Sequence, residues 1–167
     1  MRFLVQPVVK LGLHATVHGV RYPDHALQAL QRAGIAFGGR IANTEVPLVF
    51  ARHRVTVHVP RRPYVQALPG IPTIRPFEAL ACGIPLISAP WEDAEGLFRP
   101  GTDYLIARDG AEMTRHLRAV LSDPALAREM AAHGMERIAE RHTCRHRAQE
   151  LLAILGRIDA RTTEEAL

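Results

Sequence analysis

The sequence has few residues that could cross-link the chain or hold it in a membrane. Its two cysteines, Cys82 and Cys144, are too few for a disulfide framework, so we expect free thiols in a reducing cytoplasm. No run reaches the roughly 18 apolar residues of a membrane-spanning helix, and the apolar run at the N-terminus is too short for a secretory signal. The 167 residues, 47% of them hydrophobic, therefore predict one globular domain.

Lysine and aromatic residues are also scarce. Lys10 is the single lysine beside 20 arginines, and aromatic residues make up only 5% of the chain. Together with the abundant alanine, this bias is typical of a GC-rich bacterial genome. The net charge of +4 is spread along the chain, whereas a nucleic-acid interface needs a clustered basic stripe with stacking aromatics. No nucleic-acid partner is therefore expected.

Short apolar runs alternate with amphipathic stretches along most of the chain, which is the pattern of βαβ units. We therefore predict an α/β fold, a Rossmann-like open parallel sheet with helices on both faces, followed by a run of C-terminal helices. The predicted strands lie at residues 13–19, 35–37, 55–59, 84–88 and 103–107. The predicted helices lie at residues 24–33, 46–51, 76–82, 109–121, 124–138 and 143–158. Residues 1–158 form the predicted domain, and residues 159–167 form a polar tail.

The stretch between the third and fourth predicted strands is unusual. Residues 60–73 contain four prolines, which predict a long structureless loop of the kind that is often functional. The loop leads into a short helix with Pro76 in its first turn. Gly134 lies inside the predicted helix at residues 124–138. Because glycine is a weak helix former, a break of the helix at this residue stays an open alternative.

The loop and the helix after it carry groups that suit a nucleoside diphosphate. Ligands of open parallel sheets bind at the carboxyl ends of the strands, where a helix N-terminus offers free N–H groups and a positive dipole end to a phosphate. Gly70 lets the backbone approach a ligand, Arg75 can contact a diphosphate, and Glu78 can accept hydrogen bonds from ribose hydroxyls. The residues alone leave open that Glu78 is a solvated charge and Arg75 a surface arginine.

Residues 75–87 read Arg-Pro-Phe-Glu-Ala-Leu-Ala-Cys-Gly-Ile-Pro-Leu-Ile, in which Phe-Glu-Ala is followed two residues later by Cys-Gly and an apolar strand. This motif resembles the C-terminal, nucleotide-sugar-binding domain of GT-B glycosyltransferases (glycosyl transferases group 1), and the CgeB-like branch in particular. Weaker similarities in the family's order lie at residues 17–23, 38–43, 101–105 and 141–143. The resemblance extends from residue 13 to residue 155.

The resemblance implies a donor substrate and a set of site residues. The glutamate that matches Glu78 holds the nucleotide ribose, the backbone ahead of it faces the diphosphate, and the loop at residues 38–43 approaches the base. The nucleotide-sugar-binding residues implied in this way are Glu78, Arg75, Thr73, Gly70, Gly39, Arg21 and Gly19. No metal or other cofactor is expected beside the nucleoside-diphosphate sugar, because a helix dipole and cations can stabilise the leaving diphosphate.

The sequence departs from the family pattern at one residue and in its length. Many retaining members carry a second glutamate where this sequence has Gly70, so a retaining or an inverting outcome stays open. A GT-B enzyme has two such domains, whereas 167 residues hold one, and the first strand of that domain is expected to be absent ahead of residues 1–11. We therefore expect transfer of the sugar to an unknown acceptor only with an N-terminal acceptor-binding domain or a second copy, and assign no catalytic residue.

A second hypothesis is a non-catalytic Rossmann-like interaction module that pairs with a separate partner domain. Its motive is the apolar edge that a lost first strand would expose. A sugar-nucleotide epimerase of the same architecture is disfavoured by the length of the chain.

Other candidate residues favour structural roles. Two pairs of histidines have the four-residue spacing of a helical zinc site: His14 with His18, and His142 with His146. Surface or capping histidines are the favoured interpretation. Cys82 is predicted to be a buried packing residue, and residues 91–95 are either a gate for the cleft or an acidic surface loop.

Overall fold

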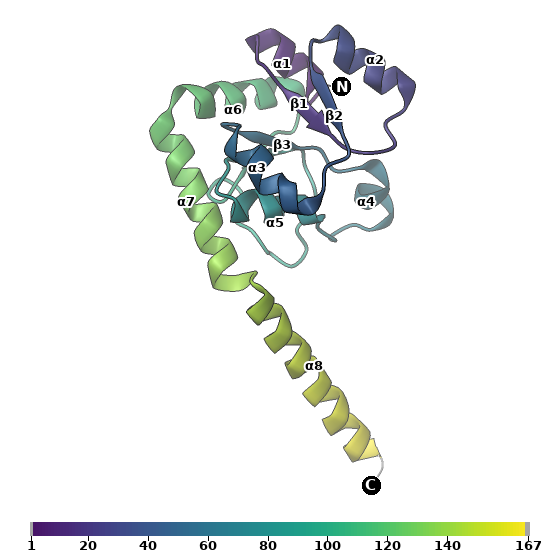
Figure 1. Cartoon of the computed structure of the whole chain (residues 1–167). Coiled ribbons are helices and arrows are strands. Elements are labelled where there is room, and N and C mark those ends of the chain that lie inside the picture. The colour runs from purple at the N-terminus through teal and green to yellow at the C-terminus, as the bar shows by residue number, and fades with distance from the viewer. Residues whose placement is uncertain (1, 166–167) are drawn as a thin grey trace.

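The computed structural model describes residues 2–165, and the side chains of residues 62–64 and 159–165 lie outside that description. Figure 1 shows an α/β body from which the last helix extends. The strands are β1 (Thr16–His18), β2 (Ala36–Gly39), β3 (Thr56–His58), β4 (Leu86–Ser88) and β5 (Leu105–Ile106). The helices are α1 (Val5–Leu11), α2 (Asp24–Arg32), α3 (Val46–Ala51), α4 (Arg62–Ala67), α5 (Ile74–Ala81), α6 (Gly110–Ser122), α7 (Pro124–Arg141) and α8 (Cys144–Glu165), with a 3-10 turn at Asn43–Glu45.

The strands form two parallel sheets. β1 pairs with β2, while β3, β4 and β5 form a three-stranded sheet in that order. The parallel pairing confirms the predicted α/β class. Within residues 2–165, however, no ladder joins β1 to β3, so the single open sheet that the sequence predicts is divided. A cavity lined by residues of both strands lies between them.

Helices cover both faces of the three-stranded sheet, as the sequence predicts. Successive residues of a strand point to opposite faces. Leu86 of β4 packs in a cluster with residues of α3 and α5, whereas Ile87 packs with Met113 of α6 and Met130 of α7. A smaller third cluster joins α1, α2 and β1. Burial of both faces explains why the strand sequences are continuous apolar runs.

Aspartates cap the starts of α6 and α7, as the sequence predicts. The Asp109 carboxylate accepts a hydrogen bond from the N–H of Glu112 (2.7 Å), and Asp123 accepts one from the N–H of Ala125 (2.9 Å). Each bond satisfies a first-turn donor that has no partner inside the helix.

Helical structure extends further than the sequence predicts in two places. Residues 60–73 are not a structureless loop, because α4 forms within them. Pro63 lies in the first turn of α4, where its missing N–H is not needed. At the C-terminus, α8 continues past residue 158, where a polar tail was expected, as far as Glu165.

Gly134 does not break its helix, since α7 is continuous through it. A Cβ at this position would lie 2.7 Å from Cδ2 of Leu80 on α5. The glycine therefore allows α7 to pack closely against α5.

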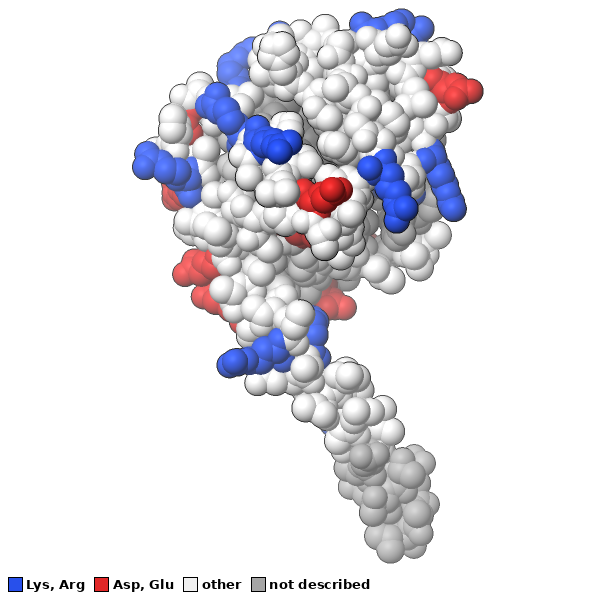
Figure 2. Space-filling view, viewed as in Figure 1, with Lys and Arg blue, Asp and Glu red and all other residues white. Residues whose placement is uncertain are grey.

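Charged residues are mixed on the face of the molecule that Figure 2 shows. Lysine and arginine side chains lie scattered over it, with aspartate and glutamate between them. Over the part of the chain that the structure describes, no helix is both long and apolar enough to cross a bilayer.

Candidate functional site

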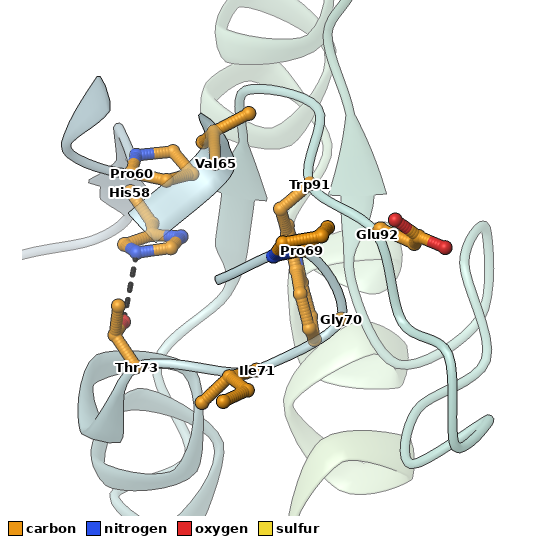
Figure 3. Close-up of a pocket in the computed structure, with 9 residues that line it drawn as sticks. All are labelled: His58, Pro60, Val65, Pro69, Gly70, Ile71, Thr73, Trp91 and Glu92. Carbon is orange, nitrogen blue, oxygen red and sulfur yellow. Dashed lines mark hydrogen bonds between the residues drawn. The ribbon is translucent and has the colours of Figure 1, made fainter. Parts of the chain in front are cut away.

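Three side chains form a hydrogen-bonded row at the carboxyl ends of β3 and β4. His58 ends β3, Ser88 ends β4, and Thr73 immediately precedes α5. The Ser88 hydroxyl donates to the carbonyl oxygen of Ala89 (2.8 Å), so it accepts from His58 Nδ1 (3.0 Å). With its proton on Nδ1, the ring accepts at Nε2 from the Thr73 hydroxyl (3.1 Å), the contact marked in Figure 3. The Ser88 contact with Ala89 thus sets the direction of every hydrogen bond in the row.

This row requires a neutral imidazole. His58 is only 7% exposed, and its burial, together with nearby Arg75, lowers its pKa to about 4. At pH 7 the ring is therefore uncharged and can accept the proton of the Thr73 hydroxyl.

The Thr73 side chain is consequently directed away from the helix that it precedes. Thr73 is the N-cap residue of α5, a position where threonine commonly accepts from a first-turn N–H, yet its side chain makes no capping bond. The N–H groups of Ile74 and Arg75 have no acceptor among the described residues. The N-terminus of α5 therefore presents free donors and the positive end of the helix dipole to an anion.

Arg75 and Glu78 lie one turn apart in α5 and form an ion pair, with 2.5 Å between Nη1 and Oε2. The Arg75 side chain is 41% exposed and the Glu78 side chain 17% exposed. The contact lacks hydrogen-bond geometry, so Glu78 Oε2 is buried without a hydrogen-bond donor from the residues described. A largely buried carboxylate oxygen with unused acceptor capacity suits a hydroxyl donor.

The three glycines that were predicted to bind the nucleotide sugar lie in two separate places. Gly19 and Gly39 meet at the carboxyl ends of β1 and β2, where the Gly19 N–H donates to the Gly39 carbonyl oxygen (2.8 Å). Arg21, just beyond, is exposed and has a positive φ of 58°. Gly70 is different, because a Cβ there would lie 2.8 Å from the Cβ of Ala94. The close backbone approach that Gly70 permits in this structure is therefore to Ala94.

A cavity of about 870 Å³ is lined by residues of β1 and β3 and reaches the first turn of α5. Its lining includes three of the predicted site residues, Gly19, Thr73 and Arg75, together with His58. Arg40 and Ile41 also line it, from the loop predicted to approach the base.

A second cavity, of about 110 Å³, shares His58 and Thr73 with the first and is drawn in Figure 3. Gly70 and Trp91 line it, and Glu92 at its edge points away from His58. Three predicted site residues line neither of these two cavities: Glu78, Gly39 and Arg21. The structure therefore brings Thr73, Arg75 and Gly19 to the larger cavity, and Thr73 and Gly70 to the smaller one.

The sequence interpretation missed His58 and Ser88. Both end an apolar strand, and the carboxyl ends of neighbouring parallel strands meet at one edge of a sheet. A polar residue at the end of each of two adjacent predicted strands was the signal that could have identified them.

Of the other candidate residues, His142, His146 and Asp93 have structural partners, whereas His18 Nδ1 is buried without a hydrogen bond from a described residue. His142 Nε2 donates to the Leu97 carbonyl oxygen (3.0 Å), and His146 Nδ1 accepts from the N–H of Thr143 (3.3 Å) at the start of α8. Asp93 accepts from the N–H groups of Leu97 and Phe98, which holds the loop after β4 in place. Within the described residues, no group of three or more histidine, cysteine or acidic side chains is arranged to hold a metal ion.

Cys82 is exposed, so the prediction of a buried packing residue is wrong. The buried face of α5 carries Pro76, Ala79 and Leu80. Cys82 comes directly after the last residue of α5, beyond this buried face, and is exposed.

The two parallel sheets, the helices on both faces and the open N-terminus of α5 define a Rossmann-like α/β domain. The chain belongs to the glycosyl transferase-like family, whose family model matches residues 2–153. No curated protein matches the sequence.

Solved glycosyltransferase structures share this fold. Sucrose-phosphate synthase from Thermosynechococcus elongatus is 18% identical with a TM-score of 0.78, over 95% of this chain and 42% of that one. HepE from Anabaena, in complex with UDP-glucose, is 17% identical with a TM-score of 0.76, over 92% and 44%. The C-terminal domain of LpcC, a glycosyl transferase group 1 family protein from Francisella tularensis, is 16% identical with a TM-score of 0.64, over 85% and 78%. The chain thus has the fold of one GT-B half-domain and spans less than half the length of the first two proteins.

Proposed function

We propose that this chain is the donor-binding half of a glycosyltransferase. It binds a nucleoside-diphosphate sugar, and transfer to an acceptor requires an additional acceptor-binding domain. The observation that carries the proposal is the uncapped N-terminus of α5, which opens beside Arg75 onto the cavity of about 870 Å³. Family membership supports it, as does the UDP-glucose bound to HepE of Anabaena. On the motif at residues 75–87 we further assign the chain to the CgeB-like branch.

The diphosphate and the ribose then each have partners in this proposal. The diphosphate accepts from the N–H groups of Ile74 and Arg75 and from the Arg75 guanidinium. The ribose hydroxyls donate to Glu78, whose Oε2 is buried without a hydrogen bond from a described residue. Arg75 contacts Glu78 in the present structure, so binding replaces this ion pair with a contact to phosphate. Gly19 contributes from the opposite side of the cavity.

Calorimetric titration with UDP-, GDP- and ADP-sugars tests the proposal. We expect one base to bind and the matching free diphosphate to compete with it. Absence of binding by all three classes would contradict the proposal.

Glu78→Gln sharpens that test. The amide keeps the size of the side chain but removes its charge and half of its acceptor capacity, so affinity should fall by about 1–3 kcal/mol. Glu150→Gln is the matched control, because Glu150 is an exposed residue of α8 that pairs with Arg147 (2.9 Å). The affinity of this control variant for the nucleotide sugar should be unchanged. Equal affinities of the two variants would remove Glu78 from the site.

A second candidate function is an interaction module that pairs with a separate domain. The observation that favours it is α8, which exposes the apolar side chains of Leu151, Leu152 and Leu155 at 47–68%. Light scattering after size exclusion tests it: a monomer whose mass does not change up to millimolar concentration argues against pairing between copies.

A further inference from the structure

Thr73 has the backbone conformation of a capping residue but does not make the hydrogen bond of one. Its φ of −82° and ψ of 163° are extended, as an N-cap residue requires. Asp109 and Asp123 have extended backbones at the same position of α6 and α7, and both accept from first-turn N–H groups. The Thr73 hydroxyl can therefore reach the first turn of α5 by rotation about its Cα–Cβ bond alone.

The sequence of the first turn leaves such a cap one N–H group to bond with. A capping side chain accepts from the N–H of the second or the third helical residue. The third residue of α5 is Pro76, which has no N–H, so the donor must be the second residue, Arg75. This N–H is also one of the two that donate to the diphosphate in the proposed function. Capping by Thr73 and binding of a diphosphate therefore compete for the same hydrogen bond.

His58 removes the Thr73 hydroxyl from this competition. The hydroxyl donates to Nε2 of His58 (3.1 Å) instead of accepting from the helix (Figure 3). The ring is buried, its Nδ1 is bonded to Ser88 (3.0 Å), and its backbone belongs to β3, which is paired with β4. The acceptor for Thr73 is therefore held in one place by the sheet.

Without His58, the first turn of α5 offers the hydroxyl its next partner. Thr73 lines both cavities, so its side chain borders open space into which it can rotate. The hydrogen bond of a threonine cap favours the capped state by about fivefold. Thr73 would then cap α5 in most molecules, and an anion would have to displace it.

A direct contact of His58 with a phosphate fits the row less well. A neutral imidazole has one N–H and one acceptor nitrogen. The N–H of His58 donates to Ser88, and the acceptor nitrogen is used by Thr73. The ring therefore has no donor left for a phosphate oxygen, and its effect on an anion must pass through Thr73.

We propose that His58 is a positioning residue for the donor site: it holds the Thr73 hydroxyl away from α5 and so keeps the Arg75 N–H free for an anion. The role rests on the proposed function, in which the anion is the diphosphate of the nucleotide sugar. Ser88 supports it by taking the Nδ1 proton, which leaves Nε2 as the acceptor.

The first test of this role needs neither a variant nor a ligand. Long-range proton–nitrogen NMR spectra of the unaltered chain distinguish a protonated from an unprotonated ring nitrogen. At pH 7 we expect the proton of His58 on Nδ1, because Nε2 must accept from Thr73. A proton on Nε2 would overturn the proposal, even if no variant of His58 folds.

The second test compares His58→Leu in two backgrounds, again without ligand. In the natural background it should slow exchange of the Arg75 amide with water by about fivefold, because the released Thr73 hydroxyl caps that N–H. In the Thr73→Val background, which has no hydroxyl to release, the same substitution should not change exchange at Arg75. Unchanged exchange in the natural background, or equal slowing in both backgrounds, would overturn the proposal. The matched control is His116→Leu, because His116 is a partly buried histidine of α6 that donates to the Ile106 carbonyl oxygen (3.1 Å), and exchange at Arg75 should be unchanged in it.

The third test titrates the same proteins with inorganic pyrophosphate, which has the diphosphate without a base. In the natural background, His58→Leu should weaken binding by about fivefold, and in the Thr73→Val background it should not weaken binding further. An equal loss in both backgrounds would show that His58 acts by packing or by direct contact, and would overturn the proposal. If pyrophosphate does not bind to the unaltered chain although exchange at Arg75 follows the expected pattern, the donor-binding function fails and the control of Thr73 by His58 stands. The two failures are therefore distinguishable.

Discussion

The three-stranded and two-stranded sheets have similar strand sequences but very different surroundings. β4 has a neighbour on each side, and all three of its residues, Leu86–Ser88, are buried. β2 has a neighbour on one side only and leaves Phe37 40% exposed. The core beside β1 and β2 contains four buried residues, whereas two larger clusters enclose β4.

This difference shows that an apolar strand becomes a core strand only through its neighbours. The hydrogen-bonded row of His58, Ser88 and Thr73 lies in the well-enclosed half, where the backbone positions are fixed by ladders on both sides of β4. The cavity between β1 and β3 lies at the boundary with the less enclosed half. The well-enclosed half therefore positions the hydrogen-bonded row.

Truncation of one core residue in each half should give the largest difference. Leu86→Ala, at a fully buried position between two strands, should lower the free energy of unfolding by about 3 kcal/mol. Val17→Ala in β1, at a position that is 9% exposed in the smallest cluster, should lower it by about 1.5 kcal/mol. Urea denaturation measures both, and Leu152→Ala, 68% exposed on α8, is the control with an expected change within about 0.5 kcal/mol. Equal losses for Leu86→Ala and Val17→Ala would break the contrast between the halves.

The enclosed half should also make stability depend on pH. The pKa of His58 is about 4 in the folded protein and 6.5 in an unfolded chain, so between these values the unfolded state binds the extra proton. The free energy of unfolding is therefore highest above about pH 6.5, and it should fall by about 3 kcal/mol as the pH drops to 4. The measurement is urea denaturation across this range, for the natural chain and for His58→Gln. The difference in slope belongs to His58, since burial also lowers the pKa of His142 in both proteins. Parallel pH profiles would contradict this assignment.

Two glycine substitutions in helices should change the stability of the fold least, and in opposite directions. Gly134→Ala places a methyl group 2.7 Å from Leu80 in the packed contact of α7 with α5, and should destabilise by about 1 kcal/mol. Gly156→Ala lies on α8, where a Cβ meets nothing within 4 Å, and should stabilise by up to about 1 kcal/mol. Thermal unfolding of the two variants measures the pair. A stabilising Gly134→Ala would show that the α5–α7 contact is looser than the structure indicates.

Much of the fold follows from local sequence patterns. The apolar runs predict every strand, and Asp109 and Asp123 predict the starts of α6 and α7. The helix within residues 60–73 could not be predicted in this way, because four prolines favour a loop. The helix α4 forms there because the one proline that it contains, Pro63, lies in its first turn. The exposure of Cys82 depended on which face of α5 met its neighbours.

The candidate site was predicted in part. The α5 segment with Thr73, Arg75 and Glu78 was visible as a helix N-terminus after a strand, although its binding role stays a prediction. His58 and Ser88 were not found, because they are 30 residues apart and meet only through the pairing of β3 with β4.

The sequence by itself determined the α/β class, most helix boundaries and the segment that resembles a nucleotide-sugar site, because periodicity, capping residues and short motifs are local properties of the chain. The tertiary structure decided which strands pair, that Thr73 bonds to a buried neutral His58 instead of capping α5, and that β1 and β3 face each other across a gap. Those features depend on contacts between residues far apart in sequence, and such contacts exist only once the chain has folded.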